Sequence, residues 1–325
     1  MHNLPAIGKR LAHVFLLLLA VIVFNFFLVR LAPGDPAEVI AGEMGGVTAE
    51  VLQDIRRSYG LDRPQLVQLG VYLGRVAQGD LGYSYFYNTP VTELIFARLG
   101  PTLVLVLTAL FFAIGIGTLL GVLASLKPAG LFSNIITVFA LVGYSMPVFW
   151  TGMMLVIVFA ATLGWFPISN MYEVTVTESG WVKFADLLHH LVLPAFTLGV
   201  IYLAQYARLA RASMLEVLDA DYIRTARAKG LGEVRVIGKH ALRNAVIPVV
   251  TIAGLQFGHL ISGAVLVETV FNWPGLGTLA LESVLGRDYP TLLGILFFSA
   301  LLVVTANLLT DLAYRVIDPR IRTGE

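Results

Sequence analysis

The sequence contains no cysteine and few charged residues. Of its 325 residues, 57% are hydrophobic and 13% are charged, whereas ordinary globular proteins carry about 25% charged residues. The absence of cysteine excludes disulfides, thiolate metal ligands, a cysteine nucleophile and a lipidated N-terminal cysteine. So few charges could not cover the surface of a soluble protein of this length. Much of the surface is therefore expected to face lipid. The net charge of +1 creates no field that would favour nucleic acid as a partner.

A nucleotide-binding loop is also absent. Gly238-Lys239 is followed by His240 instead of Ser or Thr, and the preceding glycine stands at the wrong spacing. The chain is therefore not expected to hydrolyse ATP by that route. His189 and His190 are adjacent, and two adjacent histidines cannot ligate a metal from one face of a helix, so no metal site is expected there.

Long apolar runs predict membrane spans. Crossing about 30 Å of hydrocarbon takes about 20 mainly apolar residues. Six runs meet this requirement or come close to it: residues 11–29, 102–125, 131–163, 191–207, 245–267 and 292–309. The third run is too long for one straight helix, and Gly143, Ser145 and Pro147 in its middle predict a kinked helix with a loop at its outer end. The first run is too long for a cleaved signal and is expected to be a span.

The basic residues predict how these spans are oriented. With both termini in the cytoplasm, the cytoplasmic segments would hold 14 of the 22 basic residues, and the two short outer loops would hold only Lys183 and Arg287. Lys and Arg concentrate in cytoplasmic loops. Counting the third run as two spans would place the basic segment 208–243 outside, against this rule. Six spans with both termini in the cytoplasm are therefore predicted.

The spans divide the chain into four predicted regions. These are an N-terminal transmembrane helix 1–32, a periplasmic insertion 33–100, a five-helix core 101–314 that contains a cytoplasmic loop 214–244, and a cytoplasmic tail 315–325. Within the insertion, helices are expected over residues 48–59, opened by Thr48, and over residues 64–78. Gly117 and Gly121 form a small-xxx-small pair and predict close helix packing.

The cytoplasmic loop carries signals for a short helix. Asp219 or Asp221 can serve as its N-cap, and Gly230 suits the left-handed residue that ends it. Its apolar face would consist of Tyr222, Ile223 and Ala226, with Arg224, Arg227 and Lys229 around that face. A short helix with a stop signal and an apolar face is more than a flexible tether needs, so a protein partner is a plausible explanation.

A second helix is predicted to start near Glu233. Arg235, Lys239 and Arg243 recur there every four residues and form one basic stripe. Two explanations of these charges remain open from the residues alone. They could hold the loop in the cytoplasm and touch anionic lipid headgroups, or they could belong to a surface that binds another protein.

The loop resembles the coupling region of binding-protein-dependent ABC importers, which is built around Glu-Ala-Ala, three residues and Gly. Arg224, Thr225, Ala226 and Gly230 occupy these places. Further segments, in matching order over nearly the whole chain, are similar to the first ("B") permease of the dipeptide, oligopeptide and nickel branch: LAPGDP at 31–36, YGLDRP at 59–64, GDLG at 79–82, SMPVFW at 145–150, RTARAKG at 224–230, HALRNAVIP at 240–248, ETVFNWPGLG at 268–277, RDYP at 287–290 and DPRIR at 318–322. Two positions depart from the pattern of the wider family. Arg224 stands where that pattern has Glu, and Arg243 stands where it has a Pro after the Gly.

The resemblance implies an all-α polytopic membrane protein with the type I ABC importer permease fold, located in the bacterial inner membrane. It implies a non-catalytic subunit of an ATP-driven importer of di- or oligopeptides that binds no cofactor itself, with ATP and Mg on two partner ATPase subunits. A second homologous permease, in a heterodimer, and a periplasmic or lipid-anchored solute-binding protein are the other implied partners. The residues expected to couple to the ATPase are Tyr222, Arg224, Thr225, Ala226, Arg227, Lys229 and Gly230.

Polar residues inside the spans are candidates for the translocation path, because each is costly when it faces lipid. Gln256 and His259 lie three residues apart on the fifth span, with Ser262 one turn further on. These side chains could line the path or hydrogen-bond to the partner permease. The segment after this span is expected to form an ordered external loop that meets the binding protein or closes the path, through Phe271, Trp273, Pro274 and Gly275.

Two of three alternative functions differ from this one in the sequence features that they require. An importer of nickel, glutathione or opines would belong to the same family, and the sequence does not separate these solutes from peptides. An ion-coupled secondary transporter would favour acidic residues at the middle of the spans and inverted repeats, and neither is visible. A membrane enzyme would need a polar constellation such as H-E-x-x-H, which does not occur.

Overall fold

The computed structural model describes residues 4–31, 36–43, 48–58, 61–84, 86–173 and 180–317. The chain divides into two compact units. The first comprises Met1–Gly100 with Thr278–Thr305, and the second comprises Pro101–Gly277 with Ala306–Glu325.

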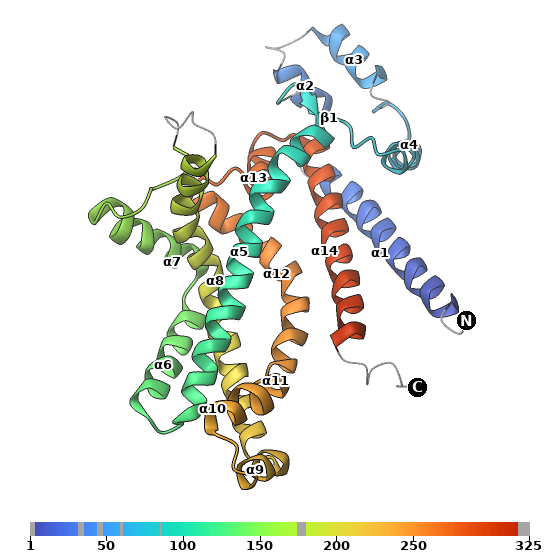
Figure 1. The fold of residues 1–325 in the computed structure, drawn as a ribbon. Coiled ribbons are helices and arrows are strands. Elements are labelled where there is room, and N and C mark those ends of the chain that lie inside the picture. Colours follow the sequence, from blue (N-terminus) through green and yellow to red (C-terminus); the bar gives the residue numbers. More distant parts are fainter. Residues whose placement is uncertain are drawn as a thin grey trace. The chain divides into compact units, whose positions relative to one another are not determined.

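Helices make up most of the described chain (Figure 1). In order, the elements are α1 (Leu4–Arg30), α2 (Pro36–Glu43), α3 (Ala49–Ser58), α4 (Gln65–Ala77), β1 (Tyr83–Ser84), β2 (Thr89–Pro90), α5 (Val91–Leu126), α6 (Leu131–Ser145), α7 (Val148–Leu155), the π-helix η1 (Val156–Thr162), α8 (Trp181–Leu218), α9 (Asp221–Ala228), α10 (Glu233–Arg235), the π-helix η2 (Val236–Ala241), α11 (Leu242–Ala245), α12 (Ile247–Val270), α13 (Leu276–Leu285) and α14 (Tyr289–Ile317).

Among the described residues, four helical segments are long and apolar enough to cross a membrane. They are Val91–Leu126, Trp181–Leu218, Glu233–Ala253 and Tyr289–Leu308. The pair α6 and α7–η1 makes a fifth if it counts as one span, and α1 contributes a shorter apolar stretch, Ala12–Leu28. The structure therefore confirms a polytopic helical protein with four or five candidate spans, and the count of six stays a prediction.

The third predicted span is broken rather than kinked. α6 ends at Ser145, α7 begins at Val148, and the chain bends by 109° from one helix to the other. Met146 and Pro147 have extended backbone between them. Proline disfavours the helical conformation for the residue before it and supplies no N–H of its own, so the helix stops at this point. The sequence predicted a kink at this place, and the structure shows a complete break of the helix instead.

Helix α8 is the centre of the second unit. It packs against α6, α7 and α12, and its 38 residues extend about 57 Å, well beyond the predicted run 191–207. The glycine pair of α5 faces it closely: a Cβ at Gly117 would lie 2.7 Å from the carbonyl oxygen of Leu203, and one at Gly121 would collide with the backbone of Ala207. The small-xxx-small prediction is therefore confirmed, because only glycine lets these two helices approach so closely.

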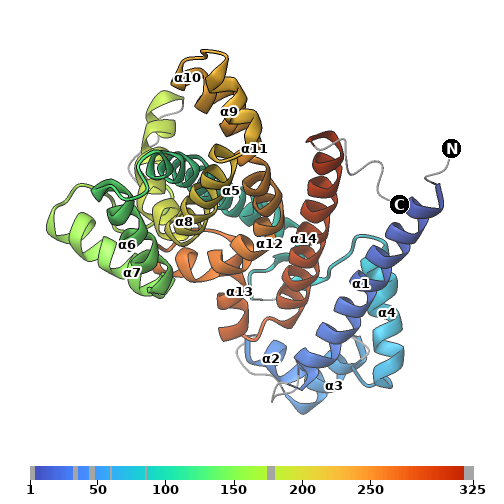
Figure 2. The ribbon, with the colours of Figure 1, turned by 90° about the horizontal axis from the view of Figure 1, so that it is seen from below.

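In the first unit, the two helices predicted within the insertion are present. Residues 48–59 and 64–78 correspond to α3 and α4 within about one residue at each end. Helix α4 lies beside α1 (Figure 2), where the rings of Tyr72 and Phe26 stack with centroids 5.9 Å apart.

The β1–β2 hairpin of the first unit is tied to the segment before α14. Ser84 Oγ and Thr291 Oγ1 both donate hydrogen bonds to Asp288 Oδ2, at 2.5 and 2.6 Å. The hydroxyl of Tyr87 donates to Glu282 Oε2 at 2.7 Å, and burial together with this hydrogen bond raises the pKa of the Tyr87 phenol. These contacts join segments that are far apart in the sequence: Ser84 and Asp288 are separated by 204 positions.

Candidate functional site: the basic elbow and the aromatic turn

The segment between α8 and α12, here called the basic elbow (residues 219–245), folds as short helices at one end of α8 (Figure 1). Gly230 adopts φ +75°, which confirms the left-handed stop predicted for α9. The predicted N-cap is wrong. Ala220 is the N-cap residue and no side chain caps the helix, while Asp219 still has helical backbone at the end of α8. Asp221 already belongs to the first turn of α9.

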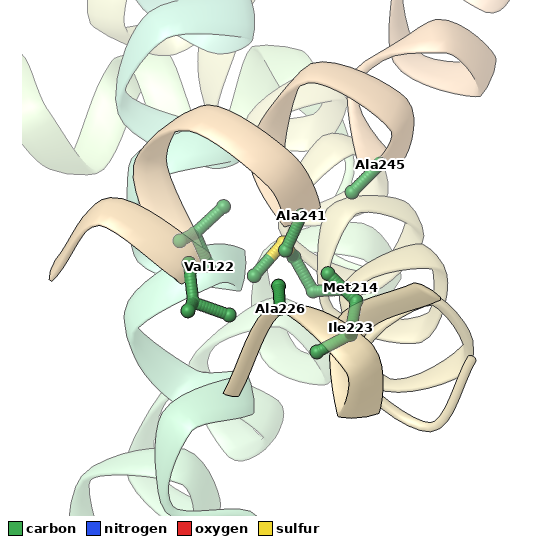
Figure 3. Close-up of a cluster of buried hydrophobic side chains, with 7 residues drawn as sticks. Val122, Met214, Ile223, Ala226, Ala241 and Ala245 are labelled. Carbon is green, nitrogen blue, oxygen red and sulfur yellow. The ribbon is translucent and has the colours of Figure 1, made fainter. Parts of the chain in front are cut away.

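The apolar face of α9 packs against the chain itself. Ile223 is completely buried and Ala226 is 7% exposed. They join a buried cluster, the elbow core, drawn in Figure 3 and composed of Val122, Met214, Ile223, Ala226, Val236, Ala241 and Ala245. These residues come from α5, α8, α9, η2 and α11. The elbow core therefore attaches α9 to the long helices α5 and α8, and the apolar face formed by Ile223 and Ala226 is not left open for a partner.

The opposite face of α9 is polar and exposed. Arg224, Thr225 and Arg227 are exposed on it, as is Lys229 directly after the helix. Tyr222, predicted to lie on the apolar face with Ile223 and Ala226, is 44% exposed, so the prediction is wrong for this residue. The Tyr222 hydroxyl accepts a hydrogen bond from Asn244 Nδ2 at 2.9 Å, and Arg227 Nη2 lies 3.0 Å from Glu233 Oε1. Exposed ion pairs of this kind contribute about 0–1 kcal/mol each. They orient side chains, and the elbow core supplies the stability.

The predicted basic stripe lies on the helices that follow α9. Arg235, Lys239 and Arg243 are all exposed, on α10, η2 and α11 respectively. The chain is π-helical between the first and the last of them. The exposed surface that these helices form together with α9 is therefore basic, and the side chains buried beneath it are apolar.

Two of the three residues predicted for the translocation path lie outside the part of the chain whose side chains are described. These are His259 and Ser262 on α12. Gln256, on the same helix, donates a hydrogen bond from Nε2 to Gln205 Oε1 on α8, at 2.9 Å. A role for any of the three in lining the path stays a prediction. Gln205 lies inside the predicted run 191–207 and so met the same criterion of a polar residue in a span. Its pairing with Gln256 could not be read from the sequence, because the two residues are 51 positions apart.

The histidine pair makes contacts within the chain. His189 Nε2 lies 2.9 Å from the carbonyl oxygen of Trp165, and His190 Nδ1 lies 3.2 Å from Asp186 Oδ1. Throughout the described residues, no three His, Asp or Glu side chains are grouped so that they could hold a metal ion.

At the other end of α12, residues 271–277 form a tight turn, here called the aromatic turn. Phe271 and Trp273 are 1% and 0% exposed, Gly275 is buried and Pro274 is half-buried. The indole Nε1–H of Trp273 donates to the carbonyl oxygen of Pro101 at 2.9 Å. The aromatic side chains therefore anchor the turn from inside. A contact with a binding protein stays a prediction, and it would use the exposed residue Asn272 and the backbone.

A buried carboxylate sits behind this turn. Glu268 is 0% exposed and accepts hydrogen bonds from Thr102 Oγ1 and from the Gly277 N–H, both at 2.7 Å. In the sequence, Glu268 stands out only as the first residue of the segment ETVFNWPGLG. Its partners could not be read from the sequence, since Thr102 is 166 positions away.

Residues 117–323 match the family described as "Binding-protein-dependent transport system inner membrane component". Residues 4–106 match the N-terminal region described for membrane components of the same transport systems. The chain belongs to this family. The resemblance seen in the sequence motifs is thereby confirmed.

Individual relatives match this inner membrane component over almost its whole length. The di/tripeptide transport system permease DppB of Pseudomonas aeruginosa is 41% identical, over 98% of this chain and 99% of the relative. The oligopeptide transport system permease AppB of Bacillus subtilis is 42% identical, over 94% and 95%. Among solved structures, an inward-facing MetNI methionine ABC transporter contains a similar chain, with a TM-score of 0.55 and 18% identity over 70% of this chain and 97% of that one. This last likeness concerns the fold alone.

Proposed function

We propose that this inner membrane component is a permease subunit of an ATP-driven importer of di- or oligopeptides. The observation that carries the proposal is 41% identity to a di/tripeptide permease over 98% of this chain and 99% of the relative. In this proposal a second, homologous permease supplies the other half of the translocation path, and a periplasmic or lipid-anchored binding protein delivers the solute. The solute is selected mainly by that binding protein.

The energy comes from two partner ATPase subunits that carry ATP and Mg, and the basic elbow of this chain docks on one of them. The exposed face of α9 is the contact surface. Ala226 packs α9 into the elbow core, and Gly230 ends the helix. Ile223 and Ala226 bind α9 into the elbow core, so a force on α9 moves α8 and α12 with it. Rocking of packed helices as rigid bodies is an established form of switching motion.

The proposed orientation follows the distribution of basic residues. The elbow and both termini lie in the cytoplasm, where Lys and Arg are preferred, and the insertion and the aromatic turn lie outside. The six spans are then α1, α5, α6 with α7–η1, α8, α12 and α14. Because the chain has no cysteine, single thiols can test this arrangement. Ala228→Cys should react with a membrane-impermeant maleimide only after the cells are opened, and Asp62→Cys should react in intact cells. The opposite pattern would invert the topology.

The function is tested with the assembled transporter. The permease is purified from its native membrane with its bound subunits, which are identified by mass spectrometry, and the complex is reconstituted in proteoliposomes. Hydrolysis of ATP should require the co-purified ATPases and should be stimulated by binding protein loaded with di- or oligopeptides. Stimulation by nickel or glutathione in place of peptides would reassign the solute. Solute uptake without any ATPase would refute the proposal.

The role of α9 is tested by two substitutions at one position, one that reverses the charge and one that keeps it. Arg224→Glu reverses a charge on the exposed face, and Arg224→Lys preserves it. Neither change touches the elbow core, because Arg224 is exposed. Arg224→Glu should lower the amount of ATPase that co-purifies, and Arg224→Lys should not. Equal recovery with both variants would remove Arg224 from the contact surface.

A further inference from the structure

The carboxylate of Glu268 joins two helices to the start of a third. It lies in the last turn of α12, and its two oxygens accept hydrogen bonds from Thr102 Oγ1 on α5 and from the backbone N–H of Gly277. Thr102 Oγ1 also accepts the N–H of Leu276, at 2.8 Å. The first two amides of α13 are thus bound by side chains of α5 and α12. Amides at a helix start have no partner within the helix and attract negative charge.

The turn leaves no space around this carboxylate. A Cβ at Gly275 would collide with the Glu268 side chain. A Cβ at Gly277 would lie 2.8 Å from Glu268 Oε2 and 2.5 Å from the Cα atom of Val265. Both glycines are therefore required for the backbone to fold around the carboxylate, as expected where a chain approaches another group closely.

Further hydrogen bonds fasten the turn at its other points. The N–H of Trp273 donates to the carbonyl oxygen of Glu268 at 2.8 Å. The N–H of Asn170 donates to the carbonyl oxygen of Phe271 at 2.9 Å, and Asn272 Nδ2 donates to Asn170 Oδ1 at 2.6 Å. The aromatic turn is consequently attached to α5, to α12 and to the segment that follows η1. It moves with these elements instead of moving independently.

The opposite end of α12 is attached to the elbow core. Ala245, at the end of α11, is 1% exposed within that cluster, and α12 begins two residues later. The 24 residues of α12 extend about 36 Å. One continuous helix therefore runs from the elbow, which faces the proposed ATPase, to the carboxylate that organises the aromatic turn.

We infer that Glu268 is a positioning residue of the transport cycle, whose carboxylate locks the aromatic turn to α12 so that displacement of the elbow is transmitted to the opposite side of the membrane. This inference rests on the proposed function and adds the residue through which the coupled motion is delivered. Hydrogen bonds to a buried charge are the strong ones, and removing one partner leaves the others unsatisfied. Weakening this lock would let α12 move while the turn stays behind.

The test uses three variants of the complete, reconstituted transporter: Glu268→Gln, Thr102→Val and Thr102→Ser. The first keeps the shape of the side chain and removes its charge. The second removes the hydroxyl at nearly constant shape, and the third restores it. The readout is the number of ATP molecules hydrolysed per solute imported. A loss of assembly would lower hydrolysis and import together, whereas loss of transmission raises this ratio.

In Glu268→Gln and Thr102→Val, hydrolysis should persist while import falls, so that the ratio rises on the order of tenfold. Thr102→Ser should retain the ratio of the unsubstituted protein. If Glu268→Gln does not assemble, the two Thr102 variants decide the matter. Equal ratios in Thr102→Val and Thr102→Ser would overturn the inference. If the unsubstituted transporter imports another solute instead of peptides, the proposed function fails, and the same ratio measured with that solute still tests Glu268.

Discussion

The basic elbow and the aromatic turn lie at the two ends of α12 and are built on opposite plans. The elbow buries aliphatic side chains around Ile223 and places its charges on the surface. The turn buries a carboxylate, Glu268, with Phe271 and Trp273 beside it. An apolar core is non-directional and tolerates small shifts, whereas buried hydrogen bonds demand one geometry. The elbow core therefore holds α9 through contacts that have no preferred direction, whereas the turn is held by hydrogen bonds that fix its shape.

Placing a charge in the elbow core should have the largest effect on stability and is the strongest test of this difference between the elbow and the turn. Ala226→Asp would bury an unpaired carboxylate at a cost of several kcal/mol. The apparent melting temperature of the complex, followed by tryptophan fluorescence, should fall by roughly 5–10 °C. Membrane insertion should persist, because the change lies between the spans. Ala228→Asp is the matched control, since Ala228 is exposed on the same helix. If both variants melt at the same temperature, α9 is not packed as described.

A methyl group added to the aromatic turn should have the next largest effect. Gly275→Ala forces a Cβ against the Glu268 carboxylate, and overpacking of this kind costs about 1–3 kcal/mol. The corresponding change in the elbow is Gly238→Ala, where no atom lies within 4 Å of the added Cβ. That change should be neutral or stabilising by up to about 1 kcal/mol. The two melting temperatures should move apart, and a fall of equal size in both would show that the turn is no more constrained than the elbow.

A smaller change in the elbow core tests whether this core tolerates a small change in packing. Ile223→Val removes one methylene from a completely buried side chain and should cost about 0.5–1.5 kcal/mol. ATP hydrolysis per solute imported should stay unchanged, because the attachment of α9 is loosened without being lost. A clear rise in that ratio would mean that the elbow depends on exact geometry as much as the turn does.

Removing a surface charge pair should have the smallest effect on stability. Arg227→Ala breaks the contact with Glu233, whose side chain is 58% exposed, and should cost no more than about 1 kcal/mol. Added salt should reduce the difference from the unsubstituted protein, since salt screens exposed charges. A larger, salt-independent loss would show that Arg227 packs on the elbow through its alkyl chain.

Local patterns predicted much of the helical structure. The stops at Gly230 and Pro147 follow from backbone restrictions of single residues, and the helix at 49–58 follows from its apolar spacing. The sharp angle at Pro147 and the length of α8 did not follow, because both depend on what the neighbouring helices allow. The N-cap of α9 was misassigned for a similar reason: α8 continues to Leu218 and holds Asp219 in a helical conformation.

The sequence by itself determined that this is a polytopic membrane protein of the binding-protein-dependent transport family, since hydropathy, basic residues and ordered motifs are properties of the linear chain. Only the tertiary structure decided which way the apolar face of α9 turns and what Glu268 holds. Burial of Ile223 depends on Val122 and Met214, and the lock at Glu268 depends on Thr102, 166 positions away. Such contacts are made by packing between distant segments, and no local pattern encodes them.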